Sequence, residues 1–294
     1  MLVANVVAQV TIVVTGGVVR LTGSGLGCST WPECEPGQFT PVRHAATSIH
    51  PYIEFGNRTL TGVLLLVGAL TAWVVWRDRS RSVGYRRLGL GPLALVVLQA
   101  VVGGVIVRLE LPPALVGLHF LISMGLIAVS TALLVRHGET DGPRIPLVSP
   151  RTRSVAAALL PLVAVVLVLG VVVTGAGPHS GDDEVGYRLA VDPAAMAKIH
   201  AGAVWLYVAA VVALLVLVRR DRAPQHTVRA AWVLLAVTLL QGLIGYVQFL
   251  TDLPAALVAA HMLGASLLVL AQVRAVMALR SREPSARLTE PSVV

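Results

Sequence analysis

The chain has 294 residues, of which 56% are hydrophobic and 13% are charged, and its mean hydropathy is +0.80. This composition excludes an ordinary soluble enzyme and is typical of an integral membrane protein. The formal net charge of +8 comes almost entirely from arginine. Such a charge indicates either a nucleic-acid partner or a membrane topology, and the positions of the arginines decide between them.

Eight apolar runs follow one another along the chain, each near the length of about 20 residues that crosses a bilayer. They are 3–21, 55–76, 88–108, 114–135, 154–175, 194–218, 230–250 and 255–279. Most of the arginines fall in the loops after the second, fourth and sixth runs and in the tail after the eighth. The positive-inside rule therefore predicts that this face and both termini are cytoplasmic. No nucleic-acid partner is expected.

The first run lacks the basic start and the small-residue cleavage site of a signal peptide, so we expect a retained helix. An arginine-rich, acid-poor transit segment is also missing, which favours a bacterial plasma membrane over an organelle. The loop that follows, 22–50, is rich in Gly, Pro and Thr and has the length of a structured lid. It places Cys28 and Cys34 on the external side. There we expect them to form a disulfide, with two free thiols or a redox-active pair as the alternatives.

Three histidines lie inside the fourth, sixth and eighth runs: His119, His200 and His261. Each follows a proline at an external helix start by six or seven residues, a depth of about 10 Å. The three imidazoles therefore share one level near the external face. At such a depth they either donate hydrogen bonds between helices or serve a function. Four other histidines fall in loops and are expected to be solvated: His44, His137, His179 and His226.

The two halves of the chain repeat each other. "LQAVVGGVIVRLELPPALVGLH" matches "LQGLIGYVQFLTDLPAALVAAH", which aligns Gln99 with Gln241 and His119 with His261 at an offset of 142 residues. Four helices return the chain to its starting side, so we expect two four-helix bundles of equal orientation, related by a pseudo-twofold axis along the membrane normal. The expected parts are the half 1–136, a cytoplasmic linker 137–153, the half 154–279 and a cytoplasmic tail 280–294.

The second half offers the arrangement that holds a haem iron from both faces, with His200 and His261 on two even-numbered helices. A structural zinc site usually includes Cys, Asp or Glu ligands, and this half has no cysteine. In the first half, the position that matches His200 at an offset of 143 residues is Asn57. An amide is a poor iron ligand, so the site of His119 is expected to be asymmetric or open, as a reaction site requires.

Other polar residues lie near Asn57 at the outer end of the second run. His50, two helical turns earlier, is an alternative ligand for a first-half haem. Glu54 shares a helical face with Asn57. Its carboxylate is either an interfacial anchor or a proton acceptor beside the haem site. Cations near external helix ends either pair with haem propionates or reach to the interface. These are Arg20, Arg58, Arg108 and Lys198.

These residues resemble the haem A synthase family, membrane enzymes with two homologous four-helix halves. "GGVVRLTGSGLGCSTWPEC", "IEFGNR", "LVGLHF", "TGAGPHSGD", the helix of His200 and "AAHM" occur in the expected order over nearly the whole chain. The resemblance implies an oxidoreductase that converts the C8 methyl of haem O to the formyl of haem A for terminal oxidases, by two hydroxylations and loss of water. The family motif is usually Glu-x-x-His, whereas this chain has Glu54 and Asn57.

For individual residues, the resemblance implies a haem b cofactor, bound through its iron, on His200 and His261, and a haem O substrate near His119. It also implies that Glu54 is the acidic residue needed for catalysis. An external cysteine pair like Cys28 and Cys34 occurs in many bacterial members. The expected partners are the lipid bilayer, the enzyme that produces haem O and an electron acceptor that the sequence does not identify, and a homo-oligomer is left open. Two alternative functions are a b-type cytochrome for quinol-linked electron transfer and a haem carrier.

Overall fold

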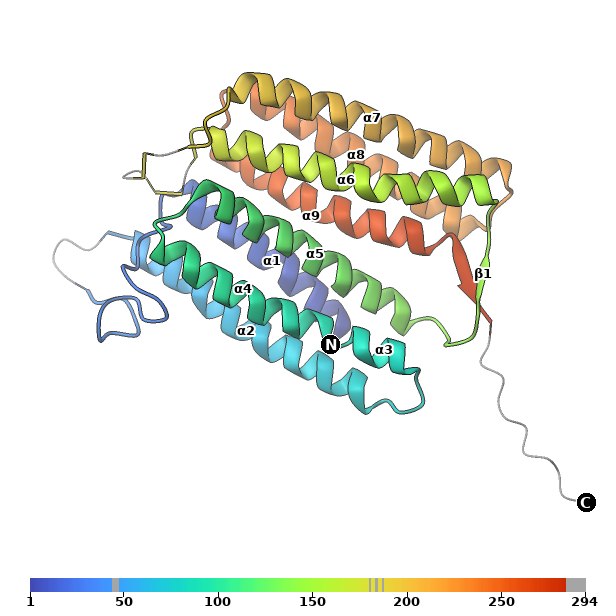
Figure 1. Ribbon diagram of the computed structural model, residues 1–294, viewed down its shortest axis with the longest axis horizontal. Coiled ribbons are helices and arrows are strands. Elements are labelled where there is room, and N and C mark those ends of the chain that lie inside the picture. Colours follow the sequence, from blue (N-terminus) through green and yellow to red (C-terminus); the bar gives the residue numbers. More distant parts are fainter. Residues whose placement is uncertain (44–47, 180, 183–184, 187, 284–294) are drawn as a thin grey trace, which may run out of the picture.

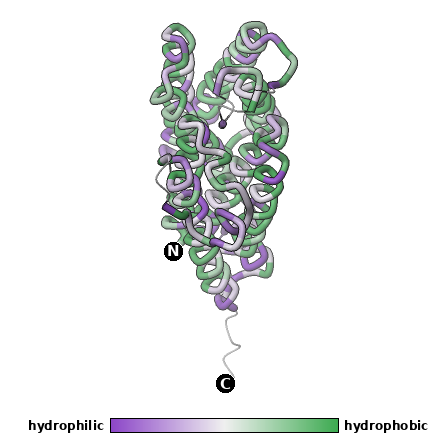
Figure 2. The backbone as a smooth tube through the Cα atoms, turned by 90° about the vertical axis from the view of Figure 1, so that its left-hand side faces the viewer, coloured by the Kyte–Doolittle hydropathy of each residue, from purple (hydrophilic) through white to green (hydrophobic). Residues whose placement is uncertain are grey.

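The computed structural model describes residues 1–43, 48–179, 181–182, 185–186 and 188–283. Within these residues, eight helical spans are long and apolar enough to cross a membrane, as predicted (Figure 1). The helices are α1 (Leu2–Leu21), α2 (His50–Arg77), α3 (Val83–Leu88), α4 (Gly91–Arg108), α5 (Pro113–His137), α6 (Pro150–Ala176), α7 (Pro193–Arg220), α8 (Gln225–Leu250) and α9 (Ala255–Met277). Helices α3 and α4 together form the third span, which begins earlier than predicted. Hydrophobic residues predominate along the helices (Figure 2).

Two groups of four long helices make up the fold. In the first half, α1, α2, α4 and α5 contact one another in a ring, and in the second half α6, α7, α8 and α9 do the same. Between the halves, α5 contacts α9 and α6, and α1 contacts α9. The repeat matches α1 with α6, α2 with α7, α4 with α8 and α5 with α9. If each helix is replaced by its match, the same set of contacting pairs is obtained. The pseudo-twofold axis itself stays a prediction.

The helix starts that fix the depth of the site are formed by proline. Proline suits the first helical turn, because the amide hydrogen that it lacks has no helical partner there. Helix α5 begins at Pro113 and α7 at Pro193, and Pro254 immediately precedes α9. The side chain of Asp192 also caps α7, accepting hydrogen bonds from the backbone NH of Ala194 (3.1 Å) and of the next residue (3.2 Å).

The turns before α5 and α9 have the same conformation. The residues at 110–111 and at 252–253 all have φ of 58° or 59°. The backbone NH of Leu111 donates to the carbonyl five residues earlier at 3.0 Å, and that of Leu253 does so at 2.8 Å. Because the two turns match, the histidines that follow them in the two halves lie at the same height in the bundle.

An apolar layer joins the two halves below this height. Val13 from α1, Met124 and Ile127 from α5, and Val269 from α9 are all buried and form one cluster. Lipid is as apolar as these side chains, so the hydrophobic effect does not drive helices together within a bilayer. Close packing between the helices holds them together instead. The halves therefore share a core and do not meet only at their loops.

At the end of the bundle that holds the N-terminus, the linker after α5 pairs with the chain after α9 (Figure 1). Strand β1 (Arg144–Pro146) is antiparallel to β2 (Arg280–Arg282). The sequence predicted plain segments at 137–153 and 280–294, so this pairing is a finding of the structure. Strands of three residues rich in arginine lack the alternating pattern that identifies a strand. Residues 284–294 of the tail lie outside the described residues.

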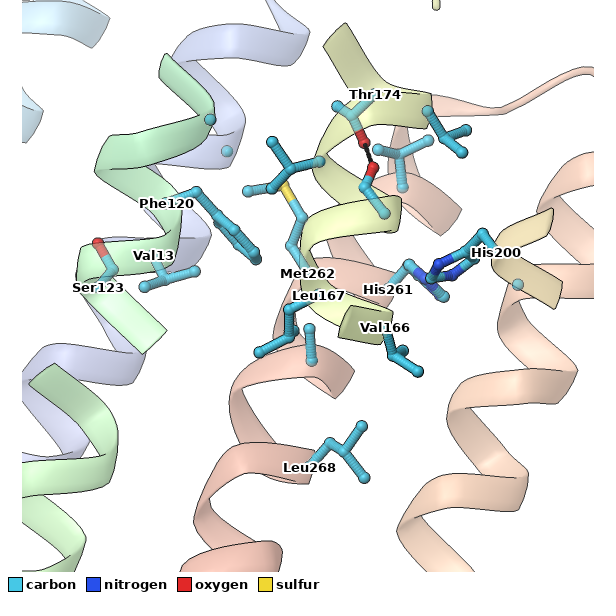
Figure 3. Close-up of a pocket in the computed structure, with 18 of the residues that line it drawn as sticks. Val13, Phe120, Ser123, Val166, Leu167, Thr174, His200, His261, Met262 and Leu268 are labelled. Carbon is cyan, nitrogen blue, oxygen red and sulfur yellow. Dashed lines mark hydrogen bonds between the residues drawn. The ribbon is translucent and has the colours of Figure 1, made fainter. Parts of the chain in front are cut away.

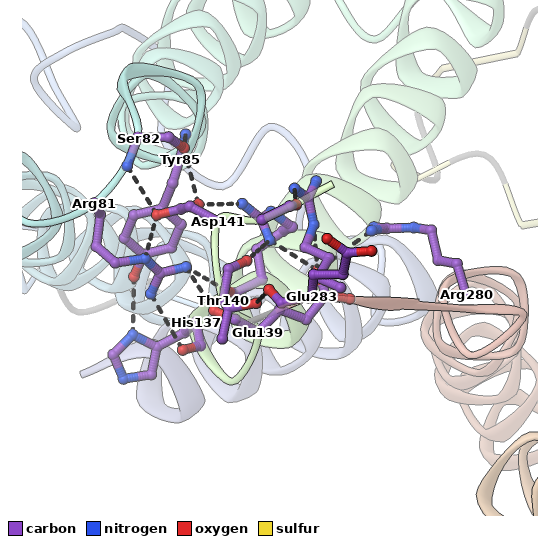
Figure 4. Close-up of polar contacts among 12 residues, drawn as sticks. Arg81, Ser82, Tyr85, His137, Glu139, Thr140, Asp141, Arg280 and Glu283 are labelled. Carbon is purple, nitrogen blue, oxygen red and sulfur yellow. Dashed lines mark hydrogen bonds and ion pairs between the residues drawn. The ribbon is translucent and has the colours of Figure 1, made fainter. Parts of the chain in front are cut away.

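An ionic cluster supports this small sheet (Figure 4). The carboxylate of Asp141 accepts hydrogen bonds from Nε of Arg81 at 2.7 Å, from the NH of Ser82 at 2.8 Å and from Nη2 of Arg136 at 2.6 Å. Burial raises the pKa of Asp141, but these hydrogen bonds outweigh burial and hold the pKa well below its usual range. Glu139 pairs with Arg136 at 2.8 Å and with both arginines of β2. The cluster therefore links the turn between α2 and α3, the end of α5 and strand β2.

The substitution Asp141→Asn is expected to lower the free energy of unfolding by about 1.5–3 kcal/mol, because hydrogen bonds between charged groups are lost. The pKa of Asp141 in the folded protein lies below its ordinary value of 3.8. Its stabilisation is therefore complete well above pH 3.8 and is lost progressively as the pH falls toward the folded-state pKa. The difference in Tm between wild type and variant should be larger at pH 7 than at pH 3. An equal difference at both values would contradict this role.

Candidate functional site

A cavity of about 690 Å³ lies toward the end of the bundle opposite the N-terminus and extends through both halves. The three histidines predicted to share one depth, His119, His200 and His261, all line it. Their Nδ1 atoms are buried and have no hydrogen-bond partner among the described residues. Buried polar groups normally have a partner, so these imidazoles are candidates for ligand binding. The volume is within the range of small-molecule and cofactor sites.

Equivalent residues of the repeat line both parts of this cavity. The amide Nε2 of Gln99 donates to the carbonyl of His119 at 3.0 Å, and that of Gln241 donates to the carbonyl of His261 at 2.8 Å. Further matched pairs that line it are Val96 and Thr238, Val116 and Val258, Leu126 and Leu268, and Leu64 and Tyr207. We call the part between α1, α2, α4 and α5 the first slot, and the part between α6, α7, α8 and α9 the second slot.

The second slot brings two imidazoles together. His200 on α7 and His261 on α9 lie next to each other (Figure 3). A side chain at Gly170 would approach Cε1 of His200 to 3.2 Å, and one at Gly245 would approach Cε1 of His261 to 3.1 Å. Glycine at both positions therefore leaves the imidazoles room beside α6 and α8. Two neighbouring histidines, apolar walls and unpaired Nδ1 atoms fit a haem that both imidazoles would hold.

Apolar side chains stand between the two slots. Phe120 of α5 and Met262 of α9 are equivalent in the repeat, and both pack on the cluster that joins the halves. Leu167 of α6 packs on the same cluster. In Figure 3, Met262 and Leu167 lie between Phe120 and the two histidines of the second slot. The cavity is therefore continuous but narrowed by an apolar wall.

The first slot is asymmetric. His119 and Asn57 both line it, and Oδ1 of Asn57 accepts a hydrogen bond from Oγ1 of Thr15 at 2.8 Å. An imidazole therefore faces the slot from α5 and an amide faces it from α2. His50 is not among the described residues that line the cavity, and its Nδ1 lies 2.8 Å from Oγ of Ser24. The structure brings His119 and Asn57 together without His50.

Glu54 lies at the base of the external loop. It is 5% exposed and is absent from the cavity-lining set of the described residues. Its carboxylate accepts a hydrogen bond from the NH of Cys28 at 2.7 Å and forms an ion pair with Arg58. Arg58 also donates to the carbonyl of Thr30 at 2.7 Å. Cys28 and Cys34 form a disulfide. Glu54 and Arg58 therefore hold the disulfide loop on α2.

The second half has no counterpart of this pair. By the offset that matches Asn57 with His200, Glu54 corresponds to Ala197 and Arg58 to Ala201. Both alanines line the second slot. At the positions where the second slot is lined by two methyl groups, the first half has an ion pair that contacts the external loop and is absent from the described cavity-lining residues. A carboxylate and a guanidinium therefore distinguish the two halves beside the slots.

The loop also covers α4. A side chain at Gly104 would meet the ring of Trp31 at 2.7 Å, so the indole lies directly on the helix backbone. Nη2 of Arg108 donates to the carbonyl of Trp31 at 3.0 Å. The loop predicted as a structured lid thus packs on the outer ends of α2 and α4.

Four cations were predicted to pair with haem propionates or to reach to the interface. Arg20 and Lys198 line the cavity, and Nη2 of Arg20 donates to the carbonyl of Thr174 at 2.8 Å. Arg58 and Arg108 instead bind the external loop, as described above. Arg188 also lines the cavity and was missed. It lies in an irregular loop, where no helical period assigns a depth to a residue.

Two of the histidines predicted to be solvated, His137 and His226, are exposed, and His179 is half-buried. Nδ1 of His137 lies 2.8 Å from the hydroxyl of Tyr85, and Nε2 of His179 lies 3.2 Å from the carbonyl of Leu253. His44 lies outside the described residues.

Comparisons with known proteins agree with this architecture. A protein named "Heme A synthase" from Oceanobacillus iheyensis is 29% identical over 140 residues, covering 47% of this chain and 44% of that protein. One from Lysinibacillus sphaericus is 32% identical over 139 residues, covering 45% and 42%. One from Exiguobacterium sibiricum is 30% identical over 143 residues, covering 46% of each.

In these matches the chain spans slightly less than half the length of its relatives. The family comparison extends further. Residues 1–180, more than half of the chain, match the family COX15-CtaA, described as "Cytochrome oxidase assembly protein". This region contains the whole first half and α6. The chain therefore belongs to the COX15-CtaA family of cytochrome oxidase assembly proteins.

Proposed function

We propose that this protein is a haem A synthase, an oxidoreductase that converts the C8 methyl group of haem O to a formyl group. The observation that carries the proposal is the asymmetry of two equivalent slots. One has two facing histidines, and the other has His119, Asn57 and a nearby carboxylate. A closed ligand pair suits electron transfer, and an open one suits a reaction on a bound molecule.

His200 and His261 would hold a haem b as axial ligands in the second slot. When bound there, the haem would supply one-electron transfer. The protein keeps the two imidazoles at one height, since the proline starts of α7 and α9 fix their depth. Gln241 holds the backbone of α9 at His261. The apolar walls exclude water from the site.

Haem O would bind in the first slot as the substrate, with His119 on one face. Asn57 is tied to Thr15 and leaves the other face without a strong iron ligand. Glu54 would accept a proton at the edge of the slot, because no other described acidic side chain lies on the same helical turn of α2. Arg58 compensates its charge. Arg20 and Lys198 are available to haem propionates.

The protein would span a bacterial plasma membrane with both termini in the cytoplasm. The arginine-rich end, with β1, β2 and the ionic cluster, would face the cytoplasm by the positive-inside rule. The haem sites and the disulfide loop would then lie toward the external face, which permits disulfides. Its partners would be the enzyme that produces haem O and an electron acceptor.

Expression in a membrane that produces haem O, followed by extraction and chromatography of the haems, tests the proposal. Haem A, or its hydroxylated precursor, is expected only where the protein is present. A folded protein that binds haem b but yields neither product would refute the synthase function and leave electron transfer. A protein that yields neither product and binds haem O alone would instead be a carrier.

A further inference from the structure

The second slot is closed toward the lipid by two aromatic side chains. Trp205 of α7 and Tyr246 of α8 both line the cavity, yet they are 58% and 46% exposed on the outside of the bundle. Nε1 of Trp205 donates to the hydroxyl of Tyr246 at 2.9 Å. The pair therefore bridges the seam between α7 and α8 at the place where the slot meets the bilayer.

The first slot lacks this pair. By the offsets that align the histidines, Trp205 corresponds to Gly62 on α2 and Tyr246 to Gly104 on α4. Gly62 is not among the described cavity-lining residues, but its neighbour Thr61 is. A Cβ atom at Gly62 would have no atom within 4 Å, so open space lies beside the helix next to the slot. Gly104 is covered by Trp31, which belongs to the external loop and not to a helix. The seam between α2 and α4 therefore has no bridge between its helices at this height.

We propose that the Trp205–Tyr246 bridge makes the second slot selective for a haem without an isoprenoid tail, whereas the first half, with glycine at both matching positions, leaves room beside α2 for the tail of a haem. The inference rests on the proposed function, which places haem b in one slot and haem O in the other. The tail of haem O is a long, apolar and flexible substituent on the rim of the macrocycle. It has to leave a slot toward the lipid, because the interior is filled by packed side chains.

Both seams are suited to these different tasks. The indole and the phenol each have a polar atom that needs a partner in an apolar environment, and each provides that partner for the other. Opening the bridge to admit a tail would separate the two polar atoms with no water to replace the lost hydrogen bond. At Gly62, by contrast, an apolar tail can lie against the helix backbone without displacing any side chain. Two haems that differ mainly in the tail are thereby sorted between two slots of common origin.

Titration of the purified, haem-depleted full-length protein with haem B or haem O tests the second slot. Its signal is the low-spin absorption spectrum of a bis-histidine haem, which the first slot, with one imidazole, does not give. Wild type is expected to bind haem O in this form at least about tenfold more weakly than haem B, or ~1.4 kcal/mol. The double variant Trp205→Gly, Tyr246→Gly copies the first half and should reduce this preference to about threefold or less, below ~0.7 kcal/mol.

Leu206→Gly is the matched control, because Leu206 is the neighbour of Trp205, is 61% exposed and is absent from the cavity-lining set. It should keep the preference of wild type. If the double variant does not fold, Tyr246→Phe removes only the hydrogen bond and should give an intermediate preference. Two results would overturn the proposal: a wild-type protein that binds both haems equally in bis-histidine form, or variants that bind haem B normally and still discriminate like wild type.

The converse variant Gly62→Trp tests the first slot. It should lower the formation of haem A by about tenfold or more, ~1.4 kcal/mol in the barrier, while the bis-histidine spectrum with haem B stays unchanged. Val63→Trp adds the same side chain at an adjacent, 47% exposed position and should behave as wild type. Normal haem A formation by Gly62→Trp would contradict the role of this seam.

The synthase function and the selectivity of the bridge can be refuted separately. Wild type that discriminates between the haems but makes no haem A refutes the synthase and retains the selective bridge. Wild type that makes haem A while its second slot accepts haem O equally well refutes the bridge and retains the synthase.

Discussion

Replacing His261 by alanine is expected to lower the affinity of the second slot for haem b by at least about 100-fold, since even losing a residue that only orients a metal ligand costs about 10- to 100-fold. His261 would supply an axial ligand to the iron, and a methyl group cannot replace it. His200 alone would leave a five-coordinate haem at best. The haem content of the purified protein and the loss of its low-spin absorption spectrum measure the effect.

His226→Ala is the matched control, because His226 lies in an exposed position at the start of α8, far along that helix from the cavity-lining residues. It should retain the haem content of wild type. His200→Ala should resemble His261→Ala, because the two imidazoles act on one iron. If either variant kept a full complement of low-spin haem b, the assignment of the second slot would be wrong.

Much of the fold follows from local patterns in the sequence. The lengths of the apolar runs predict the spans, the prolines predict the outer helix starts, and the repeat aligns His119 with His261. Each of these features is local. The repeat adds a prediction about tertiary structure, because matching turns place matching residues of the two halves at the same depth. The hydrogen bonds of Gln99 and Gln241 to the backbone of the two histidine helices support that reasoning.

The parts that the sequence did not predict depend on contacts between distant segments. The pairing of β1 with β2 joins residues on both sides of the second half, and neither strand is long enough to have a pattern. The contacts of Glu54 were not predicted for the same reason. Its location on α2 was predicted, but its bond to the backbone of Cys28 depends on how the external loop folds back. A search for residues that differ between the two halves, such as Trp205 and Gly62, could have identified the lipid-facing seam from the sequence.

The second prediction with a large effect concerns Glu54. The substitution Glu54→Gln is expected to lower the rate of haem A formation by about 100-fold or more, the usual contribution of a positioned proton acceptor. The amide keeps the size of the side chain and can still accept the hydrogen bond from Cys28, but it cannot take up a proton. Haem b bound in the second slot should stay at the level of wild type. The measurement is haem A formed per mole of bound haem b.

Glu54 also holds the disulfide loop, so its role as a proton acceptor has to be separated from its role as an anchor. Arg58→Met keeps the carboxylate and removes the contacts of the guanidinium with Glu54 and Thr30. If Glu54 acts only by holding the loop, Arg58→Met and Glu54→Gln should reduce the rate of haem A formation to a similar extent. If Glu54 accepts a proton, Glu54→Gln should reduce it far more, and Glu54→Asp should restore part of it.

The positions of Ala197 and Ala201 make this distinction decisive, because the second slot keeps its shape without any such pair. The second slot therefore forms without a carboxylate at the position of Glu54, and a carboxylate that occurs there only in the first half would serve the reaction. Glu33→Gln is the control within the loop, since Glu33 binds the NH of Gly37 at 2.9 Å and has no contact with Glu54 among the described residues. Full activity of Glu54→Gln would remove Glu54 from the reaction and leave it as the anchor of the lid.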